Sequence, residues 1–187
     1  MKYLLQKRED MRLFTCVWVP GVLREKIKKF QQEMIKLPIK AKFVETNNLH
    51  LTVTFLGDVN EGKIDWLKSQ LDLSVEDTKK FNLKLGGLKI IPNENYIKVM
   101  GIQVMSEEMP ELIKKVAKYI GGDYHEATKL TLCRVKNVMD KKIIKEFIEK
   151  HRNVKIGGFE VRSVALVNST LTRNGPVYET IHESSLE

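Results

Sequence analysis

The sequence predicts an α+β protein in which two lobes of similar build share one interface. Strand and helix patterns follow one another in the order strand, helix, strand, helix, two strands, helix, strand, helix, two strands. This order reads as one arrangement used twice, with the second pass beginning near Tyr96. No fixed-period repeat, low-complexity segment or flexible linker is evident, so we expect the lobes to pack as one unit.

Apolar periodicity defines the elements of the first pass. The segment RLFTCVWVP at 12–20 is typical of a largely buried strand ended by Pro-Gly. Apolar residues recur every three or four positions through 22–35, which predicts a helix with one apolar face. A short strand at Phe43 and Val44 leads into an Asn-Asn turn. The strand 49–56 and a helix over 61–73 follow.

The second pass carries clearer boundary signals. The turn formers PNEN join strands at 81–91 and 96–105. Ser106 can cap the helix 106–120, and Gly121 and Gly122 end it. The remaining expected elements are a strand at 129–135, a helix at 141–151 capped by Asp140, and strands at 159–170 and 177–181.

Composition narrows the class of protein and its partners. With 42% hydrophobic and 30% charged residues, the chain is expected to be a soluble globular protein. It has no apolar run of transmembrane length and no signal-peptide pattern, so we expect a cytoplasmic protein without membrane association. The net charge of +8 favours polyanionic partners, although a Lys/Glu-rich solvated surface explains it equally well.

Cysteine usage indicates neither a disulfide nor a metal site. Cys16 and Cys133 each lie within an apolar stretch, which favours two buried thiols in a reducing compartment. No metal-ligand spacing is present.

Two of the strands carry related motifs, HLTVTF beginning at His50 and KLTLCR beginning at Lys129. Alternate side chains of a strand share a face, so His50 lies on the face of Thr52, and Lys129 on that of Thr131. If a pseudo-twofold axis relates the lobes, these four side chains converge in one cleft. Such a cleft suits attack at phosphorus, with two titratable groups moving protons and two hydroxyls binding the non-bridging oxygens. This scheme requires no metal.

A structural explanation has to be weighed against this site. A single His-X-Thr in an apolar strand arises often by chance, and such a residue is usually structural or on the surface. Two related strands in equivalent positions of a duplicated pattern favour a shared site, but they do not decide the matter.

Four segments are similar to the 2H phosphoesterase superfamily, and within it to the RNA 2′,3′-cyclic phosphodiesterases, also called 2′-5′ RNA ligases. MRLFTCVWVP resembles the opening strand, HLTVTFLGDV and KLTLCRVK the two His-X-(Thr/Ser)-X motifs, and STLTRNGPVYETI the closing hairpin. The resemblance begins at Met11. We therefore expect residues 1–10 to be an N-terminal extension and 11–187 to form a single bilobal domain.

The resemblance implies a bilobal α+β 2H phosphoesterase fold, with two pseudo-twofold-related lobes, antiparallel sheets lining a central cleft, and helices outside. It implies hydrolysis of a 2′,3′-cyclic phosphate, at an RNA end or on a nucleoside, to a 2′-phosphate. Joining of RNA ends through a 2′-5′ linkage is also associated with these proteins. The family further implies a monomer that needs no metal and no cofactor.

Site roles follow from the resemblance residue by residue. His50 matches the first catalytic His, usually assigned as proton donor, while Thr52 and Thr131 match the phosphate-binding hydroxyls. Phe55 and Arg134 match the pair that sandwiches the nucleobase. An aromatic face and a guanidinium plane are good stacking surfaces for any base, which gives this last role an independent physical basis.

Lys129 stands where the family has its second catalytic His, usually the proton acceptor. An unperturbed lysine, with a pKa of about 10.4, is almost wholly protonated at neutral pH and cannot act as a base. Three interpretations follow. In the first, His50 activates water while a cationic Lys129 donates the proton; in the second, burial and positive neighbours lower the Lys129 pKa until Lys129 becomes a base. In the third, the cleft binds RNA ends without turnover.

The other histidines and lysines have less specific expectations. His125 is expected in a loop at the rim of the cleft, with direct substitution for the missing His as the alternative. His151 and His182 are expected on the surface. Lysines that flank the motif strands, namely Lys40, Lys42 and Lys136, are candidates for contacts with an RNA backbone.

Overall fold

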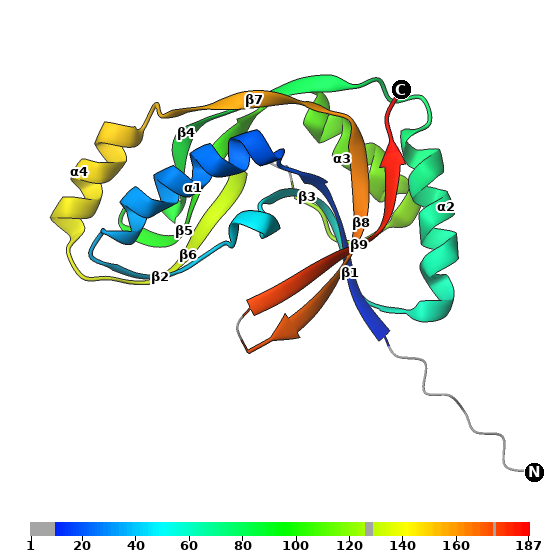
Figure 1. Ribbon diagram of the computed structural model, residues 1–187, viewed down its shortest axis with the longest axis horizontal. Coiled ribbons are helices and arrows are strands. Elements are labelled where there is room, and N and C mark those ends of the chain that lie inside the picture. Colours follow the sequence, from blue (N-terminus) through cyan, green and yellow to red (C-terminus); the bar gives the residue numbers. More distant parts are fainter. Residues whose placement is uncertain (1–9, 126–128, 174) are drawn as a thin grey trace, which may run out of the picture.

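Two antiparallel sheets form the centre of the protein (Figure 1). The computed structural model describes residues 10–125, 129–173 and 175–187. The first sheet has the strand order β3-β1-β8-β9, and the second has the order β2-β6-β5-β4-β7. The strands are β1 (Asp10–Trp18), β2 (Ile39–Phe43), β3 (His50–Asn60), β4 (Phe81–Asn93), β5 (Tyr96–Met105), β6 (Lys129–Val138), β7 (Lys155–Val161), β8 (Ser163–Thr172) and β9 (Gly175–Ser185).

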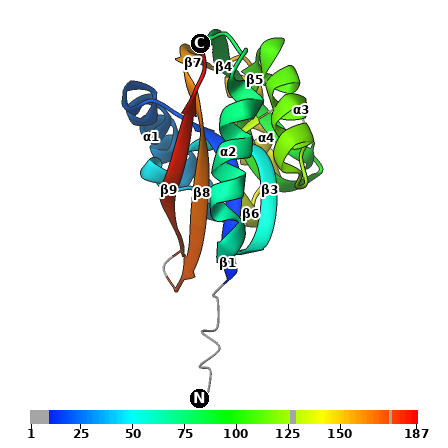
Figure 2. The ribbon, with the colours of Figure 1, turned by 90° about the vertical axis from the view of Figure 1, so that its right-hand side faces the viewer.

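Helices cover the outer face of each sheet. The pair α1 (Gly21–Ile35) and α4 (Lys141–His151) lies against the five-stranded sheet. The pair α2 (Ile64–Val75) and α3 (Glu108–Ile120) lies against the four-stranded sheet, as Figure 2 shows. Each helix buries one apolar stripe, and burying each large apolar side chain contributes about 1.5–3 kcal/mol. The expected α+β fold with antiparallel sheets and external helices is confirmed.

Several predicted boundaries are found in the structure. Asp140 caps α4, because its carboxylate accepts hydrogen bonds from the backbone N–H groups of Lys142 and Ile143. Ser106 Oγ accepts a hydrogen bond from the Met109 N–H at the start of α3. Gly121 ends that helix with a φ of 74°, a conformation that favours glycine.

Two strand predictions were wrong. The single strand expected at 159–170 is two strands, β7 and β8, which belong to different sheets and meet at Arg162. The short strand expected at Phe43 and Val44 is instead the five-residue strand β2, which ends at Phe43 and pairs with β6. Long-range pairing decided both outcomes, and a local apolar pattern carries no information about it.

The two passes of the chain do not form one sheet each. The first-pass strands β2 and β4 join the second-pass strands β5, β6 and β7 in the five-stranded sheet. The four-stranded sheet likewise combines β1 and β3 with the C-terminal hairpin β8–β9. Each sheet therefore contains one motif strand. β6 lies between β2 of the first pass and β5 of the second, whereas β3 lies at the edge of its sheet beside β1.

Two histidines expected on the surface are largely enclosed. The His151 side chain is 13% exposed and lies between Phe30 and Phe147, because α4 packs on α1 there. His182 Nε2 lies 2.8 Å from the Asp72 carboxylate and so links β9 to α2. The surface prediction was wrong for His151, and the His182 side chain is only 27% exposed.

Three further expectations concern the cysteines, a membrane-spanning helix and the N-terminal extension. Cys16 and Cys133 are both buried and free, as predicted, and burial raises the pKa of Cys133 to about 12. Among the described residues, no helix is both long and apolar enough to cross a bilayer. The N-terminal extension predicted at 1–10 falls outside the described residues except for Asp10, where β1 begins.

Candidate active site

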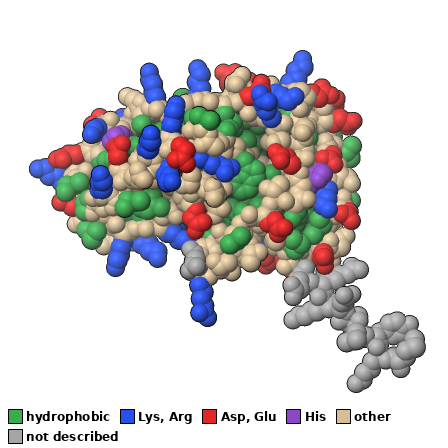
Figure 3. Space-filling model, in the orientation of Figure 1, with side chains coloured by type: hydrophobic (Ala, Val, Ile, Leu, Met, Phe, Trp, Pro, Cys, Tyr) green, Lys and Arg blue, Asp and Glu red, His purple; other side chains and the backbone are tan. Residues whose placement is uncertain are grey.

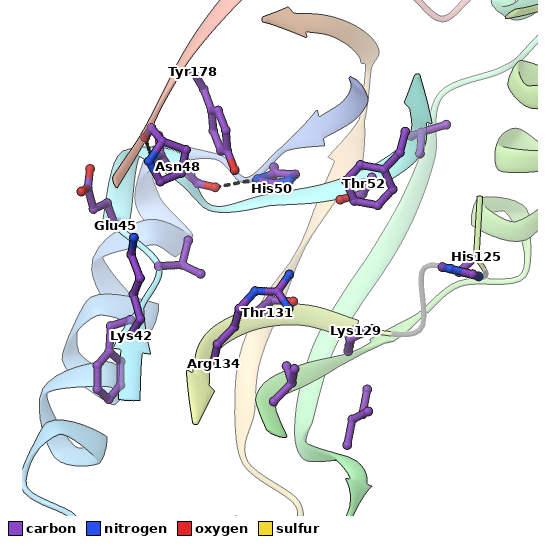
Figure 4. A pocket seen from close by; sticks show the side chains of 17 residues that line it. Lys42, Glu45, Asn48, His50, Thr52, His125, Lys129, Thr131, Arg134 and Tyr178 are labelled. Atoms are coloured by element: carbon purple, nitrogen blue, oxygen red, sulfur yellow. Dashed lines mark hydrogen bonds between the residues drawn. The ribbon is translucent and has the colours of Figure 1, made fainter. Parts of the chain in front are cut away.

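One cleft of about 520 Å³ lies between the two sheets and is lined by residues of both motif strands (Figure 4). All the residues that the sequence put forward as site residues line it: His50, Thr52, Phe55, Lys129, Thr131 and Arg134. The structure thus brings together side chains that are about 80 positions apart in the chain. Their chemical roles stay predictions.

Matching β-bulges explain how each strand presents its motif. The pairing of β3 with β1 leaves Val53 as an extra residue, and the pairing of β6 with β5 leaves Leu132 as one. A bulge interrupts the alternation of side chains. The sixth motif residue, Phe55 or Arg134, therefore returns to the face of the first and third. In a regular strand it would point to the opposite face.

The His50 ring is held on several sides. Its Nδ1–H donates a hydrogen bond to the Asn48 carbonyl oxygen at 2.6 Å. The ring centroid lies 5.1 Å from that of Phe14, 5.7 Å from that of Trp18 and 5.5 Å from that of Tyr178. Burial lowers the pKa of His50, and the hydrogen bond to Asn48 partly opposes this shift. His50 is therefore neutral at pH 7, with the Nε2 lone pair available.

Lys129 occupies a more open and more positive environment. Its side chain is half-buried, and burial lowers its pKa, with further lowering from the charges of Arg134 and Lys89. Both effects disfavour the ammonium form. Release of the Lys129 proton is therefore easier than for a lysine in water.

Thr52 and Thr131 are held by the strands next to their own. Thr52 pairs with Cys16 of β1, and Thr131 pairs with Gly101 of β5. A Cβ at Gly101 would lie 2.5 Å from the carbonyl oxygen of Leu130, so only glycine allows β5 to approach β6 this closely. The two hydroxyls then face the same cleft.

The loop after α3 fixes the backbone of Phe55. Phe55 and Asp123 exchange two backbone hydrogen bonds, at 2.7 and 2.8 Å. A Cβ at Gly122, which has a φ of 91°, would lie 2.6 Å from the Phe55 carbonyl oxygen. The Phe55 side chain remains 50% exposed and available for stacking. His125, in the same loop, lines the cleft, as its predicted rim position requires.

The cleft has further lining residues that were not predicted as site residues, among them Tyr178, Lys42, Glu45 and Asn48. Tyr178 of β9 meets the His50 ring edge-on, at an interplanar angle of 87°. Lys42, Glu45 and Asn48 lie on β2 and the following turn, and Lys42 pairs with Arg134 across β2 and β6. Only Lys42 had a sequence signal, as a cation near the first motif. The others depend on the closing hairpin returning to this turn.

Charge is not confined to the cleft. Figure 3 shows Lys and Arg side chains more densely over the half of this face that carries α1 and α4 than over the half with α2.

Among the described residues, no group of three or more His, Cys, Asp or Glu side chains could hold a metal ion. The metal-free reaction stays a prediction.

Comparisons with known proteins identify the family. A profile described as LigT-like phosphoesterase matches residues 17–100. A Methanocaldococcus jannaschii protein named RNA 2′,3′-cyclic phosphodiesterase is 38% identical over 178 residues, covering 92% of this chain and 99% of that protein. The chain belongs to the LigT-like phosphoesterase family.

Solved LigT-like structures share the whole fold. A Thermus thermophilus protein has a TM-score of 0.77 and 25% identity, with 94% of this chain and 98% of that chain covered. E. coli LigT, solved in complex with 3′-AMP, has a TM-score of 0.69 and 18% identity, with 95% and 98% covered. The likeness to these two solved structures therefore extends over nearly the whole chain.

Proposed function

We propose that this protein hydrolyses 2′,3′-cyclic phosphates, at RNA ends or on nucleosides, to 2′-phosphates. The observation that carries the proposal is the meeting of His50 and Thr52 with Lys129 and Thr131 in one cleft, from equivalent positions of two bulged strands. The name of the M. jannaschii relative, which is similar over nearly the whole chain, supports the same substrate.

His50 is the proposed general base. Its Nδ1–H is engaged by the Asn48 carbonyl and burial lowers its pKa, so the free Nε2 can take a proton from water. The water oxygen forms a bond to phosphorus and the bond from phosphorus to O3′ breaks. This assignment exchanges the roles that the family resemblance implies, because a lysine, with an ordinary pKa of about 10.4, holds its proton near neutral pH, whereas a histidine can be free to accept one.

Lys129 is the proposed general acid. Its ammonium group balances charge on the phosphate and gives a proton to the departing O3′, leaving a 3′-hydroxyl and a 2′-phosphate. The lowered pKa of Lys129 favours this transfer. Thr52 and Thr131 donate hydrogen bonds to the non-bridging oxygens, and no proposed step requires a metal.

Phe55 and Arg134 are the proposed base-binding pair. Both return to the cleft face after their bulges, and stacking on an aromatic ring or a guanidinium plane tolerates every base. The same cleft would also join RNA ends if an RNA 5′-hydroxyl replaced water, since breaking the bond to O3′ then leaves a 2′-5′ linkage.

A second candidate is a protein that binds RNA ends without turnover, which the presence of Lys129 in place of His favours. The deciding assay gives the purified protein a nucleoside 2′,3′-cyclic phosphate and follows 2′-phosphate formation for wild type, His50→Ala and Lys129→His. We expect turnover that His50→Ala lowers by about 10²- to 10⁴-fold and that a metal chelator leaves unchanged. An inert wild type that binds the substrate, with activity gained in Lys129→His, would establish the second candidate.

A further inference from the structure

Asn48 makes two hydrogen bonds that face different parts of the molecule (Figure 4). Its side-chain Nδ2–H donates to the Pro176 carbonyl oxygen of the closing hairpin at 3.0 Å. Its own carbonyl oxygen accepts the Nδ1–H of His50 at 2.6 Å. One residue therefore joins the hairpin, 128 positions away, to the histidine of the first motif.

The turn that carries Asn48 is short and is held by local and long-range hydrogen bonds. It is a single 3₁₀ turn, η1 (Thr46–Asn48), held by a backbone bond from the Asn48 N–H to the Glu45 carbonyl at 2.9 Å. Such short turns have poor hydrogen-bond geometry and are readily distorted. The bond to Pro176 thus adds a side-chain link to the closing hairpin, beside the backbone bond from the Val19 N–H to the carbonyl oxygen of the next residue, Leu49, at 3.2 Å. It helps to fix the direction of the Asn48 peptide.

The hairpin also touches His50 from another side. Tyr178, two residues after Pro176 on β9, meets the His50 ring edge-on with the ring centroids 5.5 Å apart. The Tyr178 ring in turn packs against Phe14 of β1, with the two ring centroids 4.9 Å apart. The hairpin and the turn both contact the imidazole, and a hydrogen bond from the Asn48 side-chain amide links the turn to the hairpin.

We propose that Asn48 is a positioning residue that sets the tautomer of His50. In a neutral imidazole only one nitrogen carries a proton, and the hydrogen bond made at one nitrogen decides which. The Asn48 carbonyl accepts only, so it holds the proton on Nδ1 and leaves Nε2 free to accept one. The catalytic consequence rests on the proposed function, whereas the tautomer itself does not.

Asn48→Asp tests this with almost no change in shape. The variant replaces the donating amide by an oxygen that repels the Pro176 carbonyl. Asn47→Asp is the matched control, because it places the same charge on the same turn at an exposed side chain. Asn48→Ala, which removes the amide without adding charge, serves as a second variant. Melting temperatures establish that each variant folds.

The first measurement is ¹⁵N NMR of the His50 ring above its pKa without substrate. Wild type and Asn47→Asp should show the Nδ1–H tautomer, and both Asn48 variants a mixture with Nε2–H. Turnover of a nucleoside 2′,3′-cyclic phosphate should then fall about 10-fold in kcat for Asn48 variants, with smaller changes in KM.

An unchanged tautomer in the folded Asn48 variants would overturn the proposal. So would a shift of equal size in Asn47→Asp, since that would trace the effect to charge alone. If the wild type shows no turnover at all, the proposed function fails, while the NMR comparison still decides whether Asn48 positions His50.

Discussion

The His50 half and the Lys129 half of the cleft share backbone geometry and differ in chemistry. In each motif the first and third residues are half-buried, the second, fourth and fifth are buried, and the sixth is exposed. Each strand has a bulge at the same motif position, Val53 or Leu132. The fold therefore repeats a way of presenting three side chains to one cleft.

The surroundings of the first motif residue are not repeated. His50 has a carbonyl acceptor and three aromatic neighbours, whereas Lys129 has two cationic neighbours, Lys89 and Arg134. Burial lowers both pKa values, which favours neutral His50 and eases proton release from Lys129, in keeping with the roles that we propose for them. A duplicated scaffold thus permits an unequal division of proton transfer.

The largest expected effect is that of His50→Ala. Removing the base should lower kcat by about 10²- to 10⁴-fold on a nucleoside 2′,3′-cyclic phosphate. His125→Ala is the comparison, because His125 lines the same cleft from its rim and should change kcat little. Equal losses in both variants would assign proton transfer to the rim instead.

Lys129→Arg separates charge from proton donation in the other half. Arginine keeps the positive charge, but with a pKa above 12 it does not release a proton near neutrality. We expect kcat to fall at least 10-fold, approaching the value of Lys129→Ala, because a proton must reach O3′. Steady-state kinetics at pH 7 provide the measurement. An Arg variant as active as wild type would reduce the role of Lys129 to charge alone.

The sixth motif positions should affect binding more than chemistry. Loss of base stacking costs about 1–3 kcal/mol, so Phe55→Ala should raise KM roughly 5- to 150-fold, and Phe55→Tyr should raise it little. An unchanged KM for Phe55→Ala would exclude the stacking role.

Arg134→Gln should raise the Lys129 pKa, because the Arg134 charge lowers it. Activity would then persist to higher pH than in wild type.

The fifth motif residue differs between the two strands, and its contribution to the free energy of unfolding can be measured. Thr54 Oγ1 lies 2.9 Å from Thr15 Oγ1 in a buried pair, whereas the equivalent Cys133 is a buried thiol. Thr54→Val leaves the Thr15 hydroxyl with only the hydrogen bond that it accepts from the Thr54 backbone N–H at 3.1 Å, and should lower the free energy of unfolding by about 1 kcal/mol. The double change of Thr15 and Thr54 to Val should cost more, because it also removes the acceptor of that buried N–H. Urea unfolding measures both, and equal costs would contradict the pairing.

The sequence predicted the site residues because the motif spacing is local. His50, Thr52, Lys129 and Thr131 follow strand alternation, and Phe55 and Arg134 came from the family resemblance. Physical reasoning alone would have placed those last two on the opposite face, since a bulge leaves no reliable mark in a single apolar strand.

Long-range contacts explain what the sequence did not predict. Asn48 and Tyr178 acquire their places from the closing hairpin returning to the first motif strand, across more than 120 positions. The division of 159–170 at Arg162 follows from pairing with β4 on one side and β1 on the other. Neither partner is visible in the local pattern of hydrophobic residues.

The pH dependence of wild-type kcat tests the division of roles most directly. A neutral His50 base and a protonated Lys129 acid predict a rise through the lowered His50 pKa, below its ordinary 6.5, and a plateau near neutrality. Above that plateau, kcat should fall as Lys129 loses its proton, at a pH below the ordinary lysine value of 10.5. A kcat that instead keeps climbing well above pH 8 would make neutral Lys129 the base and contradict this account.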